Sequence, residues 1–450
     1  MSTQPPASAS PASASPAHRT RFDTVAVVGA SMAGLLAARV LADHARRVLL
    51  IERDPVRTHA PLPRKGTPQG WHAHALLGSG HRVLESLFPG LTTTLQAQGA
   101  CLGGGAYFTA GGYLEAGNDG GSLYASRGLL EHAVRHAVLA LPSVQLMDGV
   151  QAESPQLEAG RVRRVRVSRL DGSGPEDLAL DLLVDASGRG SRTPQWLAAS
   201  GYGTPPVERV EVGMRYATRV LHRCAGDLAG RRFFAVSPTP ALPRACGILA
   251  QEGDRWIVTL IGYFGDQPPV DDAGFLAFAR SLPAPEPAAL IAQAEPLDEV
   301  RTYAFPANRR VRYERLTRRP QGLLVIGDAL AVFSPVYGQG MSVAALQAQA
   351  LQRCLAGGTD ALEARFFEAA ARVIDTPWTL AVGNDRQLAP GGPHGSLPQR
   401  LRARWVQRVL RAGHRDRVVA DAFLRVARLL DPPTALLRPA LVARVLRSGA

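Results

Sequence analysis

The sequence contains few cysteines, and they are widely separated: Cys101, Cys224, Cys246 and Cys354. They form neither a CxxC metal motif nor the dense spacing of a disulfide framework. His72 and His74 have no third residue at ligand spacing, so we predict no metal site. This cysteine usage is typical of a reducing cytoplasm, where we expect the protein to reside.

Long apolar runs and a secretory leader are also lacking. No run reaches the roughly 18 uninterrupted apolar residues that a membrane-spanning helix needs. Residues 1–17 are rich in Ala, Ser and Pro, without a basic start followed by an apolar stretch, so they do not have the pattern of a secretory signal. We predict that residues 1–20 form a disordered tail.

Lysine is almost absent, yet the chain is strongly basic. The formal net charge is +13, and twelve Arg and three Asp in residues 400–450 account for +9 of it. Charge gathered at one end does not indicate a nucleic-acid surface spread over the fold. The arginines of residues 161–167 recur at a period of two, which is typical of the solvent face of a strand. We therefore expect no nucleic-acid partner.

The basic segment 386–450 has helical periodicity. Leu401, Trp405 and Val409 lie on one stripe, and the Asp-Pro-Pro sequence at 431–433 ends the next helical run. We predict amphipathic helices that cover or approach the entrance to a substrate pocket. Two arrangements stay open: packing against the cofactor domain with the arginines in water, or peripheral contact with a membrane surface or a carrier protein.

A strand, turn, helix and second strand are predicted in residues 24–54. Gly29 permits a tight turn, Gly34 lets the helix pack close to the strand, and the small Ser31 lets backbone N–H groups reach a pyrophosphate. Glu52 follows Gly34 by 18 positions, where such folds bind a ribose hydroxyl. Its charge disfavours the 2′-phosphate of NADP and leaves FAD or NAD. The predicted cofactor-binding residues here are Gly29, Ser31, Ala33, Gly34, Glu52 and Arg53.

A second strand, turn and helix start are predicted in residues 322–342. An apolar run leads to Gly327 and Asp328, and a helical pattern begins near residue 343. The turn places a carboxylate, and glycines where a backbone can approach a ligand, next to a helix N-terminus. The predicted cofactor-binding residues here are Asp328, Pro335, Gly338, Gly340 and Met341.

The two segments together resemble the single-component, PHBH-like FAD-dependent monooxygenases. The resemblance implies that Asp328 hydrogen-bonds the ribityl chain of a non-covalently bound FAD and that the Gly338–Met341 turn lies along the isoalloxazine ring. It places Arg127 near the flavin and its ribityl-phosphate linker. The segments 64–77 and 181–194 look like a bacterial branch that includes polyether epoxidases, and the 340–344 turn is similar to that of squalene epoxidases.

The predicted fold class is α/β, with a GR2-type Rossmann FAD-binding domain of the PHBH-like type, an inserted antiparallel β-sheet and C-terminal helices. After the tail, the predicted domains are the first part of the FAD-binding domain at 21–204, the substrate-domain sheet at 205–315, the second part of the FAD-binding domain at 316–385 and the basic helices at 386–450.

The resemblance also implies a reaction. FAD reduced by NADPH or NADH captures O2 as a flavin C4a-hydroperoxide and transfers one oxygen atom to a small lipophilic substrate, with epoxidation favoured. No catalytic side chain is nominated, because the cofactor supplies the chemistry. The alternatives are an aromatic hydroxylase, a reductase or dehydrogenase of the same fold, and a non-enzymatic flavin-binding protein at a membrane surface or carrier. Ser187-Gly188, where many members have Asp-Gly, bears on hydride delivery. The sequence leaves the oligomeric state open.

Overall fold

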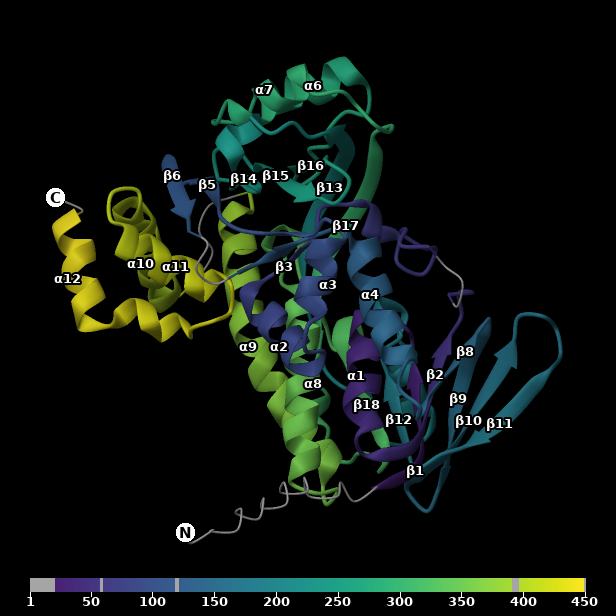
Figure 1. Ribbon diagram of the computed structural model, residues 1–450. Coiled ribbons are helices and arrows are strands. Elements are labelled where there is room, and N and C mark those ends of the chain that lie inside the picture. Colours follow the sequence, from purple (N-terminus) through teal and green to yellow (C-terminus); the bar gives the residue numbers. More distant parts are fainter. Residues whose placement is uncertain (1–20, 57–59, 118–120, 391–395, 449–450) are drawn as a thin grey trace, which may run out of the picture.

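The computed structural model describes residues 21–56, 60–117, 121–390 and 396–448. Its centre is a five-stranded parallel sheet, in which every neighbouring pair of strands runs parallel. The order is β18 (Leu323–Val325), β12 (Leu182–Asp185), β1 (Phe22–Val28), β2 (Ala45–Glu52) and β8 (Val144–Asp148) (Figure 1). The predicted strand, turn, helix and strand of residues 24–54 is confirmed.

Helices surround this sheet, and they contact it or one another through buried apolar residues. Eight of the eleven residues of α1 are buried, and α1 packs against both α8 and α4. The long helix α9 runs beside α8 (Figure 1). The helices of this layer are α1 (Met32–Ala42), α2 (Gly78–Leu87), α3 (Leu91–Ala97), α4 (Arg127–Leu139), α5 (Thr193–Ala199), α8 (Gly340–Ala356) and α9 (Leu362–Leu388).

An eight-stranded sheet lies beyond the parallel sheet, and its neighbouring strands are antiparallel except for the pair β14–β5. Its order is β19 (Ala331–Val332), β17 (Arg301–Val311), β13 (Val207–His222), β16 (Arg255–Gly262), β15 (Arg244–Gln251), β14 (Phe233–Val236), β5 (Gly105–Thr109) and β6 (Gly112–Ala116). Strands β5, β6 and β19 come from outside the predicted 205–315 segment. The helices α6 (Asp272–Arg280) and α7 (Glu286–Gln293) cover one face, α6 through Phe275 and Phe278 and α7 through Leu290.

The arginine-rich segment 161–185 is divided between two sheets. Residues 161–169 do pair with 175–179 in an antiparallel hairpin, and 150–158 add a third strand. The last run, Leu182–Asp185, instead joins the parallel sheet, because all four of its residues are apolar or buried and it has no solvent face. The small strands are β9 (Val150–Glu158), β10 (Arg161–Arg169), β11 (Pro175–Ala179), β3 (Ala75–Leu76), β7 (Leu123–Tyr124) and β4 (Cys101–Leu102).

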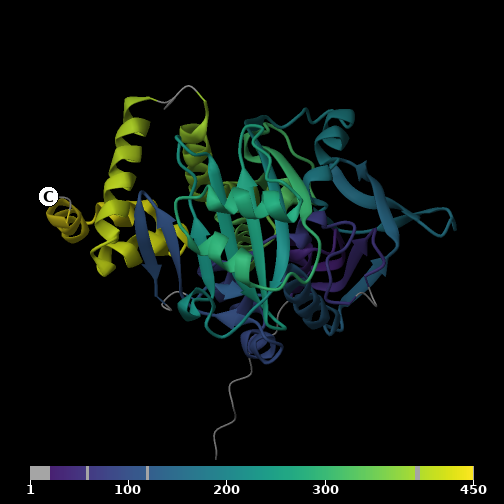
Figure 2. The same cartoon turned by 90° about the horizontal axis from the view of Figure 1, so that it is seen from above.

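The basic C-terminal segment forms the helices α10 (Leu397–Gly413), α11 (Arg417–Ala427) and α12 (Pro439–Ser448), with the short 3-10 helix η7 (Pro433–Leu437) before α12. They share a small core of their own and lie beside strand β6 (Figure 2). They contact this strand through Leu114. Val409 is fully buried as predicted, but Leu401 is 53% exposed, because the first turns of α10 extend past the surface that covers Val409. Among the described residues, no helix is long and apolar enough to cross a membrane.

Candidate functional site

The turn between β1 and α1 is built so closely that side chains are excluded from it. Gly29 has a φ of +101°, and a Cβ there would lie 2.5 Å from the carbonyl oxygen of Ala186. A Cβ on Gly34 would collide with the carbonyl oxygen of Gly29. The first turn of α1 has no side-chain cap at Ser31, and its residues line a large cavity. Unpaired N–H groups at a helix N-terminus facing a cavity form a site for an anion such as a pyrophosphate.

Glu52, at the end of β2, is buried beside this turn. Its Oε2 accepts a hydrogen bond from the backbone N–H of Ala30 at 2.8 Å, and its Oε1 accepts one from the N–H of Asp54 at 3.0 Å. The carboxylate thus ties the end of β2 to the turn after β1 while it also lines the cavity. A ribose contact by Glu52 stays a prediction.

A buried cluster of charged side chains lies next to the β1–α1 turn. Arg64 lies 2.8 Å from Glu131, 2.9 Å from Asp54 and 3.3 Å from Glu52, and all four side chains are at most 10% exposed. Burial alone would raise the pKa of Glu131, but the nearby Arg127 and Arg64 outweigh it and hold that pKa below its ordinary value. The Glu131 carboxylate therefore stays ionised although it is buried.

Arg127 joins this cluster to the pyrophosphate turn. Its Nη2 donates to Ser31 Oγ at 2.7 Å and to Glu131 Oε2 at 3.2 Å, and Ser31 Oγ donates to Glu131 Oε2 at 2.8 Å. The Nε of Arg127 is buried with no hydrogen-bond partner among the described residues. A buried donor without a partner is costly, so this N–H is a candidate to donate to a bound anion.

The second predicted segment meets the first at the parallel sheet's edge. Gly327 has a φ of +70°, and a Cβ there would lie 2.5 Å from the Cβ of Ala33. The next residue, Asp328, lines the cavity, and its carboxylate makes no hydrogen bond within the described part of the chain. Burial raises its pKa. An isolated carboxylate that faces a cavity is well suited to accept a hydrogen bond from a ligand hydroxyl.

The turn that follows Asp328 approaches the cavity with backbone. The 3-10 helix η6 (Pro335–Tyr337) ends at Gly338, which has a φ of +61°, and α8 begins at Gly340. The Oε1 atom of Gln339 is buried without a hydrogen-bond partner among the described residues.

A carboxylate on α9 anchors this turn. Asp385 is 1% exposed and accepts hydrogen bonds from Tyr337 Oη at 3.1 Å and from Asn308 Nδ2 at 2.7 Å. Asn308 Oδ1 in turn accepts from the N–H of Ser334 at 2.6 Å. Burial raises the pKa of Asp385 to about 6, although both donors oppose that rise. Strand β17, helix α9 and the turn at 334–338 are thereby joined at one buried point.

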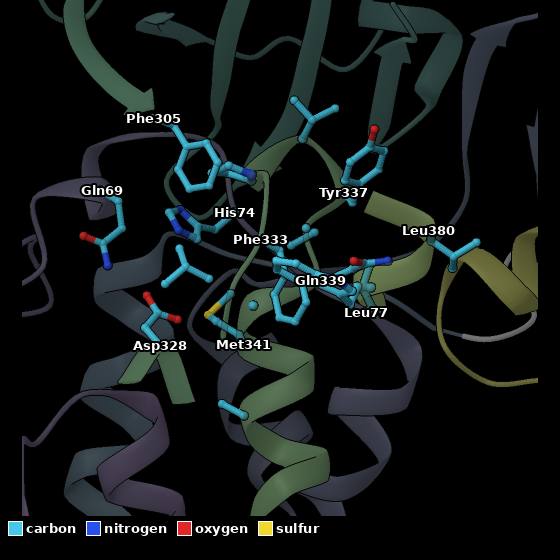
Figure 3. Close-up of a pocket in the computed structure, with 18 of the residues that line it drawn as sticks. Gln69, His74, Leu77, Phe305, Asp328, Phe333, Tyr337, Gln339, Met341 and Leu380 are labelled. Atoms are coloured by element: carbon cyan, nitrogen blue, oxygen red, sulfur yellow. The ribbon is translucent and has the colours of Figure 1, made fainter. Parts of the chain in front are cut away.

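One cavity of about 1300 Å³ connects these features. It runs from the β1–α1 turn past Asp328 and then beneath the eight-stranded sheet to the C-terminal helices. In Figure 3, Asp328 and Gln69 lie toward one end, Phe333, Gln339 and Met341 in the middle, and Leu380 at the other end.

The middle of the cavity is mainly apolar and aromatic. Tyr216, Tyr303 and Phe305 line it from the eight-stranded sheet. His74 also lines it, and burial lowers the pKa of His74 to about 3, while burial together with Arg301 lowers the pKa of His72 to about 4. Both imidazoles are therefore neutral at physiological pH. His72 Nδ1 lies 2.7 Å from Thr218 Oγ1, and within the described residues no group of three metal-ligating side chains is found.

The structure brings the predicted site residues together on the wall of this cavity. The lining residues among them are Gly29, Ser31, Ala33, Glu52, Arg53, Arg127, Asp328, Pro335, Gly338, Gly340 and Met341. Gly34 does not line the cavity and instead sits at the contact between helix and strand.

Several residues of the site were missed. Arg64 lies in the segment 64–77, but no local pattern of the sequence predicts its role. Arg189 lines the cavity and donates to Tyr303 Oη. Its position directly after Ser187-Gly188 is the sequence feature that marks it as a residue of the site. Asp385 occupies the buried stripe of α9 that includes Ile374, Trp378 and Ala381. An acid on an apolar stripe was a signal for a buried polar role.

Comparison with known proteins gives the fold and a relative. No protein-family profile matches the chain. It is similar to protein Rv3254 of Mycobacterium tuberculosis (strain ATCC 25618 / H37Rv), with 34% identity over 437 residues that cover 91% of this chain and 90% of the relative.

Among solved structures, the chain is similar to the p-nitrophenol 4-monooxygenase PnpA from Pseudomonas putida DLL-E4, with a TM-score of 0.64, 17% identity and coverage of 91% of this chain and 99% of that one. It is also similar to PqsL, a probable FAD-dependent monooxygenase from Pseudomonas aeruginosa, with a TM-score of 0.61, 19% identity and coverage of 82% and 98%. The predicted fold, that of the PHBH-like FAD-dependent monooxygenases, is confirmed.

Proposed function

The chain belongs to the family of protein Rv3254 of Mycobacterium tuberculosis, and we propose that it is an FAD-dependent monooxygenase. One observation carries the proposal. A single cavity joins an anion-binding helix N-terminus, a carboxylate without a hydrogen-bond partner in the described chain and an apolar chamber. These three features match, in order, the pyrophosphate, the hydroxylated ribityl chain and the substrate side of a flavin.

The cavity wall fits FAD at the pyrophosphate end. The first turn of α1, with Ser31 and Ala33, would hold the pyrophosphate through backbone N–H groups, and the buried Nε of Arg127 would donate to it. Glu52 and the exposed Arg53 would bind the adenosine half. The remaining lone pairs of the Glu52 carboxylate are available for a ribose hydroxyl, because each oxygen can accept two hydrogen bonds.

The part of the cavity around Asp328 and the Gly338–Met341 turn fits the flavin half. Asp328 would accept a hydrogen bond from the ribityl chain, and the backbone of the Gly338–Met341 turn would lie along the ring. Bound FAD, once reduced by NADH or NADPH, supplies the activation of O2 and the transfer of one of its oxygen atoms. The protein's own part is to position the ring, exclude water and hold the substrate.

The substrate side favours a lipophilic alkene and epoxidation. The chamber beneath the eight-stranded sheet is lined by Phe305, Val332 and Phe333, and it continues toward Trp378 and Leu410. Such walls bind by burial of apolar surface and offer few groups to bind a polar ring substrate. They also keep water from the reacting atoms. The similarity of the 340–344 turn to squalene epoxidases, and of two further segments to the polyether-epoxidase branch, supports the same choice.

Two alternatives rest on specific features. A reductase or dehydrogenase is suggested by Ser187, which lines the cavity and whose N–H and Oγ both donate to Asp185 Oδ1, at 2.9 and 2.5 Å. An aromatic hydroxylase is suggested by the likeness to the p-nitrophenol 4-monooxygenase, which at 17% identity concerns the fold. A non-enzymatic flavin-binding protein would retain FAD without turnover.

The test is incubation of the purified yellow protein with NADH or NADPH, isotopically labelled O2 and candidate lipophilic alkenes. We expect one labelled oxygen atom in an epoxide, with stoichiometric consumption of O2. Product oxygen derived from water, or full turnover without O2, would refute the monooxygenase. A labelled phenol would refute only the choice of epoxidation, and a colourless protein that FAD cannot reconstitute would refute the cofactor.

The C-terminal helices carry a separate proposal of peripheral contact with a membrane surface. Exposed apolar side chains stand beside the arginines on these helices, among them Leu397, Leu401 and Leu446. Basic amphipathic helices bind anionic lipid surfaces. Co-sedimentation with vesicles that does not depend on anionic lipid or on salt would contradict this contact.

A further inference from the structure

The outer end of the cavity lies between α9 and α10, and one stripe on each helix lines it together with polar residues such as Asn384 and Gln387. On α9 the stripe contains Trp378, Val382 and Arg386, and on α10 it contains Arg402, Val406 and Leu410. A spacing of four residues keeps each set on one helix face. Each stripe is therefore apolar toward the inside of the cavity and ends in an arginine.

The arginines of the two stripes belong to the same end of the cavity. Arg386 lies in the last turn of α9, and Arg402 lies in the second turn of α10. Arg400, in the first turn of α10, also lines the cavity. A Cβ added to Gly383 would lie 3.8 Å from a terminal nitrogen of Arg402. The guanidinium of Arg402 is thus held against α9, one turn from Arg386. Figure 3 shows Leu380 at this end, far from Asp328.

The protein offers these arginines no counter-charge among its described residues. Arg386, Arg400 and Arg402 form no ion pair there. The acids of the C-terminal helices are engaged elsewhere: Asp416 with Arg444 at 3.0 Å, Asp421 with Arg417 at 3.8 Å and Asp431 with Arg425 at 2.7 Å.

The acidic side chains that line the cavity are not near this end. They are Glu52 and Asp328, and both belong to the cofactor half. The outer end therefore carries the positive charge of three exposed arginines, and the wall that leads inward from it includes the apolar side chains of both stripes. Charges of one sign at the end of a low-dielectric cleft attract a ligand of the opposite charge.

We propose that this end of the cavity binds the anionic head group of a lipophilic substrate, a carboxylate or a phosphate, while the hydrocarbon chain extends inward toward Phe333 and Tyr337. This names the substrate class of the proposed monooxygenase and rests on that function only in calling the bound molecule a substrate. Guanidinium groups suit either head group, because their paired N–H donors match the geometry of carboxylate and phosphate oxygens. Arg402 is the central contact, since it projects from the cavity-lining stripe and packs on the neighbouring helix.

Binding is measured by isothermal titration calorimetry on the oxidised, FAD-loaded protein without reductant, with myristoleate, myristoleyl phosphate and myristoleyl alcohol below their aggregation concentrations. The variant is Arg402→Met, which keeps an apolar stem and loses the charge. Arg404→Met is the matched control, because Arg404 lies on the same helix but does not line the cavity.

We expect at least one of the two anions to bind about tenfold more tightly than the alcohol, and Arg402→Met to remove most of that difference. Arg404→Met should leave it unchanged, and added salt should weaken binding of the anion alone. The ratio between the carboxylate and the phosphate identifies the head group. Equal affinities for all three compounds, no binding of either anion, or equal losses in the two variants would overturn the proposal.

These outcomes are separate from those of the proposed function. A protein that oxygenates alkenes but does not distinguish the anions from the alcohol would refute the head-group site alone. An FAD-loaded protein that prefers the anions but, with NADH or NADPH, neither consumes O2 nor oxygenates alkenes would refute the monooxygenase alone.

Discussion

Replacing Arg64 with methionine tests whether the buried charged cluster holds the pyrophosphate turn in place. The guanidinium contacts Glu131, Asp54 and Glu52 at 2.8, 2.9 and 3.3 Å, and the Arg64 side chain is 4% exposed. Methionine fills part of the same space with an apolar stem, but it removes the charge and all of the donors. Three buried carboxylates would then share the remaining cations, Arg127 and Arg135, whose ion pairs are with Glu131.

The expected loss in the free energy of unfolding at neutral pH is about 3–5 kcal/mol, the range found when one partner of a buried ion pair is removed. The loss arises mainly from the carboxylates that stay buried without a cation. FAD binding should weaken as well, because Glu131 accepts from Ser31 Oγ in the pyrophosphate turn. The matched control is Arg166→Met, which breaks an exposed bidentate pair with Asp177 at 3.0 and 3.2 Å.

The assay is urea unfolding followed by circular dichroism, at neutral pH and again near pH 5. In the wild type, the lowered pKa of Glu131 contributes stability above its unfolded value, and that stability declines as the pH falls through the folded value. In Arg64→Met, burial without the nearby guanidinium favours the protonated acid, so the native state takes up a proton and gains stability as the pH falls. The deficit of the variant should therefore be smaller near pH 5.

Two results would refute this reasoning. One is a loss below about 1 kcal/mol at neutral pH, which is the range of an exposed ion pair. The other is an equal loss in Arg64→Met and Arg166→Met.

Two further predictions concern Asp328, which lines the cavity, and Asp385, which is buried and anchors the turn at 334–338. Asp328→Ala should weaken FAD binding to the apoprotein about tenfold or more, because it removes a charge-assisted hydrogen bond. Asp328→Asn should weaken FAD binding less. Unchanged affinity in a fluorescence titration of Asp328→Ala would contradict the ribityl contact. Because burial raises the pKa of Asp385 to about 6, the native state holds a proton that the unfolded chain releases near pH 4. The free energy of unfolding should therefore fall by at most about 3 kcal/mol between pH 4 and pH 6. Asp385→Asn should lack that decline in urea titrations, and equal slopes in the two proteins would show that the site is solvated.

The parts of the fold that the sequence predicts are those decided by local rules. The turn at Gly29 needs a positive φ and the contact at Gly34 tolerates no Cβ, so the glycines themselves mark the geometry. The hairpin of β15 and β16 follows from two apolar runs around a short turn, and the alternation of Val212, Met214 and Tyr216 places their side chains on the buried face of β13.

The parts that the sequence does not predict depend on partners far away in the chain. Strand β5 joins the eight-stranded sheet by pairing Ala106 with Phe234, which lies more than a hundred residues later, and no local pattern names that partner. The charged cluster is similar, since Arg64 lies just before the 3-10 helix η1 (Pro68–Trp71) and meets Glu131 where this segment packs on α4. Asp385 marks itself as unusual by its place on an apolar stripe, but its donors come from β17 and the turn at 334–338.

The C-terminal helices show why a periodic pattern is not enough to place a segment. Their stripes predict that one face is buried, and Val409 and Leu410 are buried as expected, but the same stripe includes the exposed Leu401. The covering surface decides the difference, because strand β6 contacts only the C-terminal half of α10 through Leu114. The N-terminal half is left to line the mouth of the cavity with Arg400 and Arg402. All three acids of residues 400–450 pair with other arginines. These acids therefore do not neutralise Arg400 and Arg402 at the outer end of the cavity. Packing therefore decides which of the arginines of this segment lie at the outer end of the cavity.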